Sequence, residues 1–531
     1  MTFSLLPDFI YVVLAIFVLQ FFNWLQIEYG RTNQFMFITF IYAIYAVATG
    51  KAFPVDGVTI ALGILTGWFF LSLIWTDSRR SVYEALTWIS YFILFMACRT
   101  LPVIYTVAAV FSAGVIFAVF QLGYIFAGKK RDGLTEMYVF GNGNHNGIYL
   151  LLCLHAGLWL TLNVSVLIFP VLCIIAVALV LTYCRAALVA AFMSLMAVAV
   201  WIHGWYAVIG IGLCLVPIAI KIIKGFDPMT APERKASSIY ERLLFYAEAL
   251  YLIRHKILFG WGLDMYRKLL PFIIPAMRAN KRTAPLFDKI GGVSRNLTHR
   301  AHNDHLEIMV ELGLVGYAMF VWFFGQFDVS LLFVGTLLAM TVNGLFFFPF
   351  RETHIAAPFW ALMGACSVSS TMPVTIPLVV KIALICAFLA VLRECQRKYL
   401  GLYYYDKMSR AKEDEEKQKY ITLALRYDPR NNGYLNDAVA IYPEGSPLQH
   451  DAAARMMHHY DGDYVMWTVW EGYARSIVAI NHLGAARMAL AKAIEINPEY
   501  LPCVELKGQI DAFLANGEEN KQGGNTCQCT K

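Results

Sequence analysis

Long apolar runs, separated by short polar stretches, occupy most of the first 393 residues of this chain. An α-helix needs about 20 consecutive apolar residues to cross a bilayer, and about thirteen runs approach that length. The pattern predicts an all-α fold, a polytopic membrane helix bundle of about 12–13 spans. The runs lie near residues 5–25, 34–49, 57–75, 82–98, 102–127, 146–164, 165–184, 186–204, 206–223, 305–324, 327–348, 355–371 and 374–393.

Two longer polar stretches interrupt this pattern, one between apolar runs and one at the C-terminal end. They divide the chain into parts that differ in composition, and such shifts mark domain boundaries. The predicted parts are an N-terminal membrane bundle (1–223), a large basic loop (224–303), C-terminal membrane helices (304–393), a soluble helical domain (394–515) and a disordered tail (516–531).

The soluble C-terminal domain contains two similar segments, residues 420–429 and 486–498, each rich in helix formers and closed by a proline. Their prolines, Pro429 and Pro498, are 69 positions apart, about twice the 34-residue period of tetratricopeptide repeats. We therefore predict a helical, tetratricopeptide-like domain, which would dock a protein partner or support the membrane part.

Composition supports the membrane class. Hydrophobic residues make up 59% of the chain and charged residues 15%, whereas a soluble protein is nearer half apolar and a quarter charged. The first run, 5–25, lacks the basic segment and the cleavage site of a signal peptide, so it is expected to remain as a membrane helix. Most cysteines stand singly in apolar runs, and Cys527 and Cys529 are expected to lie in a polar tail, so no disulfide framework is predicted.

The large loop concentrates positive charge. Residues 224–303 contain fourteen basic and six acidic residues, a net charge of +8, whereas the whole chain carries +6. Such a loop would attract an anionic ligand or lipid headgroups, and the alternative is a solvated loop that happens to be basic. The positive-inside rule would place it in the cytoplasm. That rule applies to charges that only set topology. If the basic residues of this loop are gathered to hold a phosphate, the rule would predict the wrong side of the membrane.

The segment 298–317 combines both patterns, because it begins with three histidines and continues as an apolar run. His302, Met309, Gly313 and Gly316 recur at the spacing of one helix face. This predicts His302 at the mouth of a helix, above glycines that would let a neighbouring helix approach closely. A histidine there can transfer protons at neutral pH.

The same segment resembles a family signature. His302-Asn303, nine residues, Gly313, two residues and Gly316 are similar to the motif of the O-antigen ligase superfamily, which includes O-antigen ligases, O-antigen polymerases and protein O-oligosaccharyltransferases. Other segments resemble family motifs in the same order. They are Leu73-Ile-Trp75-Thr-Asp, Gly141-Asn-Gly-Asn144-His145, Cys184-Arg185-Ala-Ala, Arg242 and Phe259-Gly260-Trp-Gly262.

Three positions depart from the family pattern. Arg300 stands where the common His-Ala-His-Asn has its first histidine, Cys184 replaces the usual serine, and Gly143 replaces a proline. These departures bear on the acceptor preference more than on the reaction.

The resemblance implies a membrane glycosyltransferase of the bacterial inner membrane, with its active site and its C-terminal domain facing the periplasm. Such enzymes move a glycan from an undecaprenyl-pyrophosphate carrier to a hydroxyl of lipid A-core, of a growing polysaccharide or of a protein, and these motifs do not separate the three acceptors. They invert the anomeric centre without a metal ion, so no metal ligand or cofactor is expected. Membrane lipids are expected partners, whereas no segment resembles a nucleic-acid module.

The resemblance also assigns roles to residues. The leaving pyrophosphate gains negative charge, which guanidinium groups can hold bidentately. Arg185 and Arg242 are therefore expected to bind it, and His302 to take the proton of the acceptor hydroxyl. Supporting roles are expected for Asn303, Asn144 and Arg300, and helix-packing roles for Gly313 and Gly316.

Other interpretations remain open. An arginine at a helix end is most often an interface anchor. A metal-dependent hydrolase could use His299, His302 and His305, although that spacing does not share one helical face well. A transporter or flippase would also have many spans, but no internal repeat of the membrane half is visible.

Three further polar residues need an explanation. His145 is expected to shape the loop before its helix. Glu307 and Glu311 stand one turn apart in an apolar run. Acids inside a membrane are commonly functional, but we expect these two to lie near the interface or to contact the basic loop.

Overall fold

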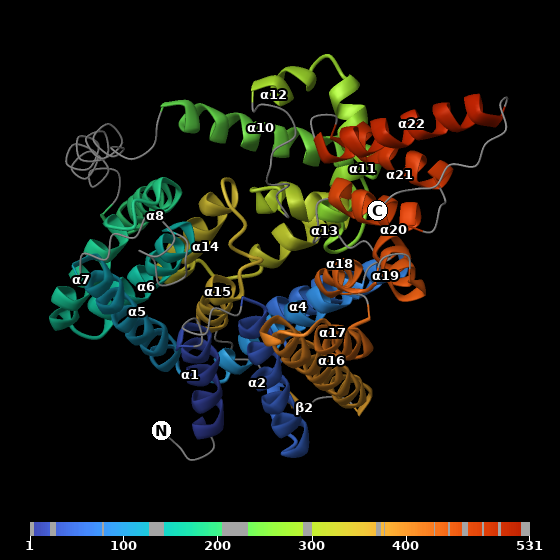
Figure 1. Ribbon diagram of the computed structural model, residues 1–531. Helices are drawn as coiled ribbons and strands as arrows, with labels where there is room; N and C mark the ends of the chain where they lie inside the picture. Colours follow the sequence, from blue (N-terminus) through green and yellow to red (C-terminus); the bar gives the residue numbers. More distant parts are fainter. Residues whose placement is uncertain are drawn as a thin grey trace. The chain divides into compact units, whose positions relative to one another are not determined.

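The computed structural model describes residues 5–21, 28–76, 79–126, 143–203, 232–289, 300–367, 373–375, 378–429, 431–443, 446–458, 466–479, 483–497 and 501–521 (Figure 1). Helices dominate these residues, as the hydropathy pattern predicts, and the only sheet among them pairs two short antiparallel strands, β1 (Ala52–Pro54) and β2 (Pro373–Thr375).

The chain divides into two compact units. The first comprises Met1–Lys235, Ala249–Asp264 and Arg300–Leu392, and the second comprises Ala236–Glu248, Met265–His299 and Arg393–Lys531. The large loop predicted as one segment thus contributes to both units, and α10 (Pro232–His255) runs through residues of each.

The first unit holds the apolar helices. Its elements are α1 (Leu6–Phe21), α2 (Glu28–Ala48), α3 (Gly57–Ser72), η3 (Leu73–Trp75), α4 (Arg79–Arg99), α5 (Val103–Phe126), α6 (Gly143–Asn163), η5 (Val166–Ile168), α7 (Phe169–Val180), α8 (Arg185–His203), α13 (Asp304–Phe324), α14 (Leu331–Gly344) and α15 (Thr353–Cys366). The long helix α16 (Leu378–Arg410) begins in this unit and continues into the second.

Among the described residues, six helices are long and apolar enough to cross a membrane. They are Gly57–Trp75, Ser81–Arg99, Val103–Gly123, Gly143–Asn163, Arg185–Ile202 and Asp304–Phe324. Shorter apolar helices lie at Leu6–Phe17, Gln34–Ala48, Val166–Val180 and Leu331–Gly344. The chain is therefore a multi-pass membrane protein, with fewer full-length spans in its described part than the 12–13 expected.

Part of this difference is a matter of helix length. The runs 327–348 and 355–371 contain α14 and α15, which have 14 residues each. At 1.5 Å per residue, such helices reach about 21 Å, less than the about 30 Å thickness of the hydrocarbon layer. The predicted run 206–223 lies outside the described residues.

Aromatic side chains form the core where α4, α13 and α15 pack together. The ring of Trp360 on α15 lies 5.8 Å from that of Trp88 and 6.4 Å from that of Phe95, both on α4. It also lies 5.6 Å from the ring of Phe323 on α13. Trp360 is fully buried, so this cluster packs α4 against α13 and α15, which lie more than 200 positions later in the sequence.

The second unit contains shorter, more polar helices. They are α11 (Met265–Ala279), α12 (Ala284–Lys289), α17 (Asp414–Tyr427), α18 (Asn432–Ile441), α19 (Pro447–His458), α20 (Met466–Ala479), α21 (Leu483–Ile496) and α22 (Leu501–Lys521). From α17 to α22, each helix packs against the next, and α11 of the large loop packs against α21. The tetratricopeptide assignment and the predicted domain boundaries stay predictions, and the predicted tail lies partly outside the described residues.

Candidate functional site

Within the described residues of the first unit, four helices begin close together: α6, α8, α13 and α15. Contacts at or just before their first residues link them: Asn144 with Cys184, His145 with His354, and both His145 and His302 with the same two phenylalanines. A helix N-terminus leaves backbone N–H groups without helical partners and carries a partial positive charge. Their convergence therefore creates a region suited to anions.

The N-termini of α6 and α8 touch directly. The thiol of Cys184, just before α8, donates to Oδ1 of Asn144 at 3.1 Å. A Cβ atom added to Gly147 of α6 would meet Cys184 and Ala187, so the two helices need a glycine there. Two motifs about 40 residues apart in the sequence are thus neighbours, and Arg185 is the exposed first residue of α8.

His302 lies in the loop before α13. Asn303 caps this helix, because its side chain accepts a hydrogen bond from the backbone N–H of Leu306. His302 therefore precedes the helix by two residues. The spacing had predicted that it shares a helical face with Gly316, and that prediction is wrong. Its φ of 51° lies in the left-handed region, which is strained for a residue with a side chain and often marks a functional position.

Two phenylalanines connect His302 to α6. The ring of His302 lies 6.0 Å from Phe347 and 5.1 Å from Phe348. The ring of His145, on α6, lies 5.1 Å from Phe347 and 6.4 Å from Phe348. Both imidazoles thus border the same aromatic pair, which brings the predicted base next to the Asn144-His145 motif.

A loop segment interrupts α13 at Gly313, which has a φ of 70° and a ψ of −176°. The backbone N–H of Trp261 donates to the Val310 carbonyl at 2.8 Å, and that of Leu314 donates to the Ile257 carbonyl at 2.8 Å. A Cβ atom on Gly313 would meet the backbone of the inserted segment. The Gly-x-Gly motif of the loop therefore enters the helix that carries the His-Asn signature.

Gly316 faces a different neighbour. Its added Cβ would meet the indole of Trp68 on α3, and that indole N–H donates to the Leu312 carbonyl at 3.2 Å. α3 and α13 approach closely here, which is the kind of packing that the glycine spacing suggested.

Arg300 fixes the loop that holds His302. Its guanidinium contacts Glu307 at 2.9 Å, Glu84 at 3.0 Å and Asp264 at 3.5 Å. Burial disfavours its charge, but the neighbouring carboxylates of Glu307, Glu84 and Asp264 outweigh burial and raise the pKa of Arg300 well above its ordinary value. Glu307 also accepts from the backbone N–H of Ala301 at 2.9 Å. Glu307 therefore contacts the basic loop, as expected.

Arg351 extends this network between α14 and α15. It contacts Glu311 at 2.5 Å, and Glu84 and Glu307 at 3.8 and 3.9 Å. The side chains of Arg351, Glu307 and Glu311 are almost completely buried. Buried charges need partners of the opposite sign, so these contacts define how α4, α13 and the start of α15 fit together.

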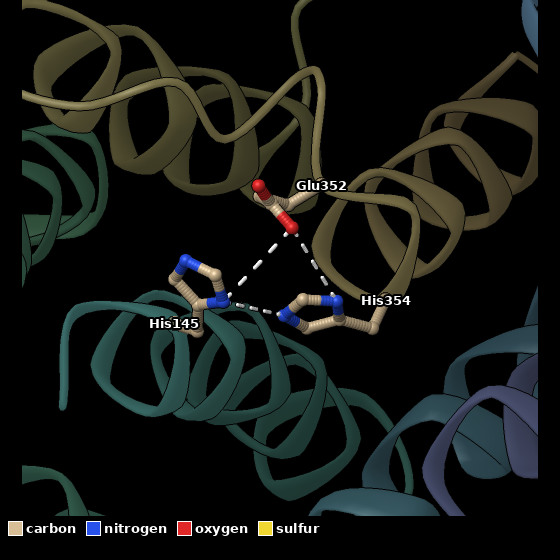
Figure 2. Close-up of side chains that lie close together, drawn as sticks. All are labelled: His145, Glu352 and His354. Atoms are coloured by element: carbon tan, nitrogen blue, oxygen red, sulfur yellow. Dashed lines mark hydrogen bonds and ion pairs between the residues drawn. The ribbon is translucent and has the colours of Figure 1, made fainter. Parts of the chain in front are cut away.

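A cluster of metal-ligand type lies at the starts of α6 and α15 (Figure 2). Nδ1 of His145 and Nε2 of His354 are 3.1 Å apart. The carboxylate of Glu352 lies 4.0 Å from Nδ1 of His145 and 3.8 Å from Nδ1 of His354. This set differs from the histidines of the hydrolase hypothesis.

That hypothesis depended on His299, His302 and His305. His299 lies outside the described residues. Nε2 of His305 lies 3.1 Å from the Thr341 carbonyl, and its Nδ1 lies 3.2 Å from the Tyr317 hydroxyl. Both ring nitrogens of His305 are thus engaged, which argues against its acting as a metal ligand.

Arg242 lies on α10, in the part of that helix that belongs to the second unit, and is half-buried. Arg185 and His302 belong to the first unit. α10 begins at Pro232 and ends at His255, so Arg242 lies near its middle.

Sequence reasoning did not assign site roles to Glu84, Arg351, Glu352 or His354. Each of them is a polar residue inside or beside an apolar run. Charged residues in such runs usually pair with one another, and this signal could have found the network. It could not have named the pairs, since Glu84 and Arg351 are 267 positions apart.

Comparison with known proteins bears on the whole arrangement. The family model for O-antigen ligase matches residues 170–321, a range that includes Cys184-Arg185, the Gly-x-Gly loop and the His302-Asn303 signature. No curated protein matches the chain. The family supports a membrane glycosyltransferase of the O-antigen ligase or polymerase type. The match confirms the resemblance of this chain to the O-antigen ligase superfamily.

Proposed function

We propose that this protein transfers a glycan from an undecaprenyl-pyrophosphate carrier to an acceptor hydroxyl, with inversion at the anomeric carbon and without a catalytic metal ion. The observation that carries this proposal is the convergence of four helix N-termini around the segments of the family signature. Helix N-termini stabilise phosphate groups through backbone N–H donors and their positive potential.

The diphosphate is the leaving group of this reaction. As the bond between the sugar and the diphosphate breaks, negative charge grows on the phosphate oxygens, and fixed cationic groups lower the barrier by stabilising it. Arg185 is suited to this role because it is the exposed first residue of α8, beside Asn144 and Cys184. Arg242 is proposed as the second arginine, contributed by α10.

His302 is the proposed general base. An imidazole ordinarily titrates near pH 6.5, so its neutral form can accept the proton of an acceptor hydroxyl at physiological pH. The acceptor oxygen then attacks the anomeric carbon while the diphosphate leaves on the opposite face. Asn303 supports His302 by capping α13, which fixes where the helix starts and thus where the imidazole stands.

Arg300 has a positioning role in this proposal. Its guanidinium contacts the carboxylates of Glu84, Asp264 and Glu307, and Glu307 also binds the backbone N–H of Ala301. These contacts hold the two residues that precede His302. Catalytic groups need such support to keep a productive geometry.

The proposed location is the inner membrane, with the active site and the C-terminal helical domain facing the periplasm. The basic loop then lies on the side where the lipid-linked glycan is presented, which explains why its charge opposes the positive-inside rule. The helices from α17 to α22 would offer a surface to a protein partner or an acceptor.

Glycan transfer from a defined lipid-linked donor, measured in detergent, tests this function. Detergent removes any gradient, so transfer supports an enzyme, whereas a transporter would give no product. Deletion of the gene, followed by analysis of lipopolysaccharide, free polysaccharide and glycoproteins, then distinguishes a ligase from a polymerase or a protein O-oligosaccharyltransferase. Wild-type protein that makes no product with any donor and acceptor pair contradicts the proposal.

A further inference from the structure

The cluster formed by His145, Glu352 and His354 has no role in the reaction proposed above. His145 is the third residue of α6, and the other two lie at the start of α15. His145 and His354 are buried, and Glu352 is partly exposed. In Figure 2 the three side chains point toward a common space between the two helix ends.

Hydrogen bonding can link two members of this cluster. Two neutral imidazoles can share one hydrogen bond, and the 3.1 Å separation of His145 and His354 allows it. The Glu352 carboxylate, however, lies 4.0 and 3.8 Å from the imidazole nitrogens. Both distances exceed the length of a hydrogen bond but are within ion-pair range, so the carboxylate lies close to both rings.

These distances suit ligands around an ion. With one donor atom from each side chain, all three atoms lie within 4.8 Å of one another. Donors bound tetrahedrally to zinc at about 2.0–2.1 Å lie about 3.3 Å apart. Nδ1 of His145 and Nε2 of His354, 3.1 Å apart, already have about this separation. The Glu352 oxygen lies 4.0 Å from that nitrogen of His145, and its 3.8 Å distance to His354 is to the other ring nitrogen, Nδ1. An inward movement of Glu352, the most exposed of the three, toward Nε2 of His354 would complete the set.

We infer that His145, His354 and Glu352 form a three-ligand site for a transition-metal ion, and that zinc is the ion this set fits. Two imidazoles and one carboxylate are ligands that zinc prefers, and sites with three protein ligands leave a fourth position for water or another ligand. Metal in this site would tie α6 to α15.

The charge of the surroundings does not rule out a cation. The positive ends of α6 and α15 weaken cation binding by about two- to fivefold each. The negative charge of Glu352 opposes that effect, and direct coordination by nitrogen and oxygen donors is stronger than either helix end by orders of magnitude.

Zinc binding by the full-length protein in detergent tests the inference. The protein is stripped with a chelator, incubated with zinc and freed of loosely bound ions, and its zinc content is then measured. We expect one zinc per chain for the wild type. His354→Ala and Glu352→Gln should each weaken binding by on the order of 100-fold or more, since each removes a ligand.

Two control variants identify the site. His255→Ala removes an exposed histidine of α10, and a double change of Cys527 and Cys529 to serine removes the other residues of the sequence that could hold metal near the C-terminus. Both should keep the zinc. Unchanged affinity in His354→Ala, or loss of zinc only in the cysteine variant, would overturn the inference.

Cobalt provides a test that needs no variant, in case the substitutions prevent folding. Co²⁺ bound by imidazole and carboxylate groups gives visible d–d bands without the thiolate charge-transfer band that cysteine ligands produce. The wild type should show only the former. Absence of visible bands, or a thiolate band, contradicts the inference. Neither measurement involves glycan transfer, so its result is independent of the proposed reaction.

Discussion

At the scale of single residues, His302 combines an unusual backbone with a proposed chemical role. Its left-handed φ is strained. Glu307 binds Arg300 and the backbone N–H of Ala301 on one side of His302, and Asn303 caps α13 on the other side. These contacts maintain the strained conformation. Strain of this kind persists only where surrounding structure enforces it. The loop therefore fixes the position of the imidazole before any substrate binds.

Loss of the His302 imidazole should abolish most transfer. General-base catalysis contributes about 10²–10⁴-fold to a rate, so His302→Ala should lower the rate of transfer by that amount while the protein remains in the membrane. The rate is measured with lipid-linked donor in detergent, beside His255→Ala as an exposed-histidine control. Full activity of His302→Ala would remove this residue from the proposed site.

Arginine and lysine should differ at position 185. A guanidinium binds two phosphate oxygens with a fixed fork, whereas an ammonium group is a point charge. Arg185→Ala should abolish transfer, and Arg185→Lys should recover only a small part of it. If lysine restores the wild-type rate, charge alone suffices and Arg185 acts as an interface anchor or a general electrostatic contributor.

Arg300 should matter for stability as well as activity. Removing one partner of a buried ion pair leaves uncompensated charge, which costs about 3–5 kcal/mol. Arg300→Gln should therefore lower the Tm of the detergent-purified protein markedly, whereas Arg254→Gln, at an exposed position of α10, should not. Equal Tm values for the two variants would mean that the carboxylates around Arg300 need no cation.

At the scale of elements, the sequence predicted helices better than their interruptions. Apolar runs identify α3 to α6 because each run is local and long. The break in α13 could not be predicted, since the backbone groups that fill it come from residues 257–262, about 50 positions earlier. The same limit applies to His302, because a spacing of three or four residues does not reveal that the helix begins only at Asp304.

The break at Gly313 can be tested by adding one methyl group. In Gly313→Ala, the new Cβ would meet the backbone of Leu258, and the left-handed φ would be strained. We therefore expect the free energy of unfolding to decrease by at least about 1–3 kcal/mol. Gly67→Ala is the matched control, because nothing lies within 4 Å of its Cβ position on α3. Thermal unfolding in detergent should show a large decrease of Tm for the first variant and little change for the second.

At the scale of the whole molecule, composition and hydropathy identified a helical membrane protein with a polar C-terminal part. The motifs indicated a resemblance to the O-antigen ligase superfamily, which the family model supports over residues 170–321. The structure brings several of these motifs together: Asn144 beside Cys184, and the Gly-x-Gly loop inside α13. The ionic network and the cluster of His145, Glu352 and His354 were missed, because their members come from segments up to 267 residues apart and none forms a local pattern.

The stability of the second unit should depend on pH through Glu248. This carboxyl group is buried and accepts a hydrogen bond from the Tyr266 hydroxyl at 3.2 Å. Burial raises its pKa to about 8 from an ordinary value of 4.5, although the Tyr266 bond acts in the opposite direction. Between these two values the folded chain keeps the proton and the unfolded chain releases it, so the free energy of unfolding decreases as pH rises.

The Tm of the wild type should therefore decrease as the pH rises from 5 to 8.5. Above that pH the stabilising contribution of protonated Glu248 is fully lost. Each unit of the shift corresponds to about 1.4 kcal/mol, so the effect is large enough to measure. In Glu248→Gln no proton can be released, and this part of the slope should vanish, whereas Glu505→Gln, an exposed position on α22, should keep it. Because both variants lose one acidic group, a parallel pH profile in the two would show that Glu248 ionises without cost and that the second unit lets water reach it.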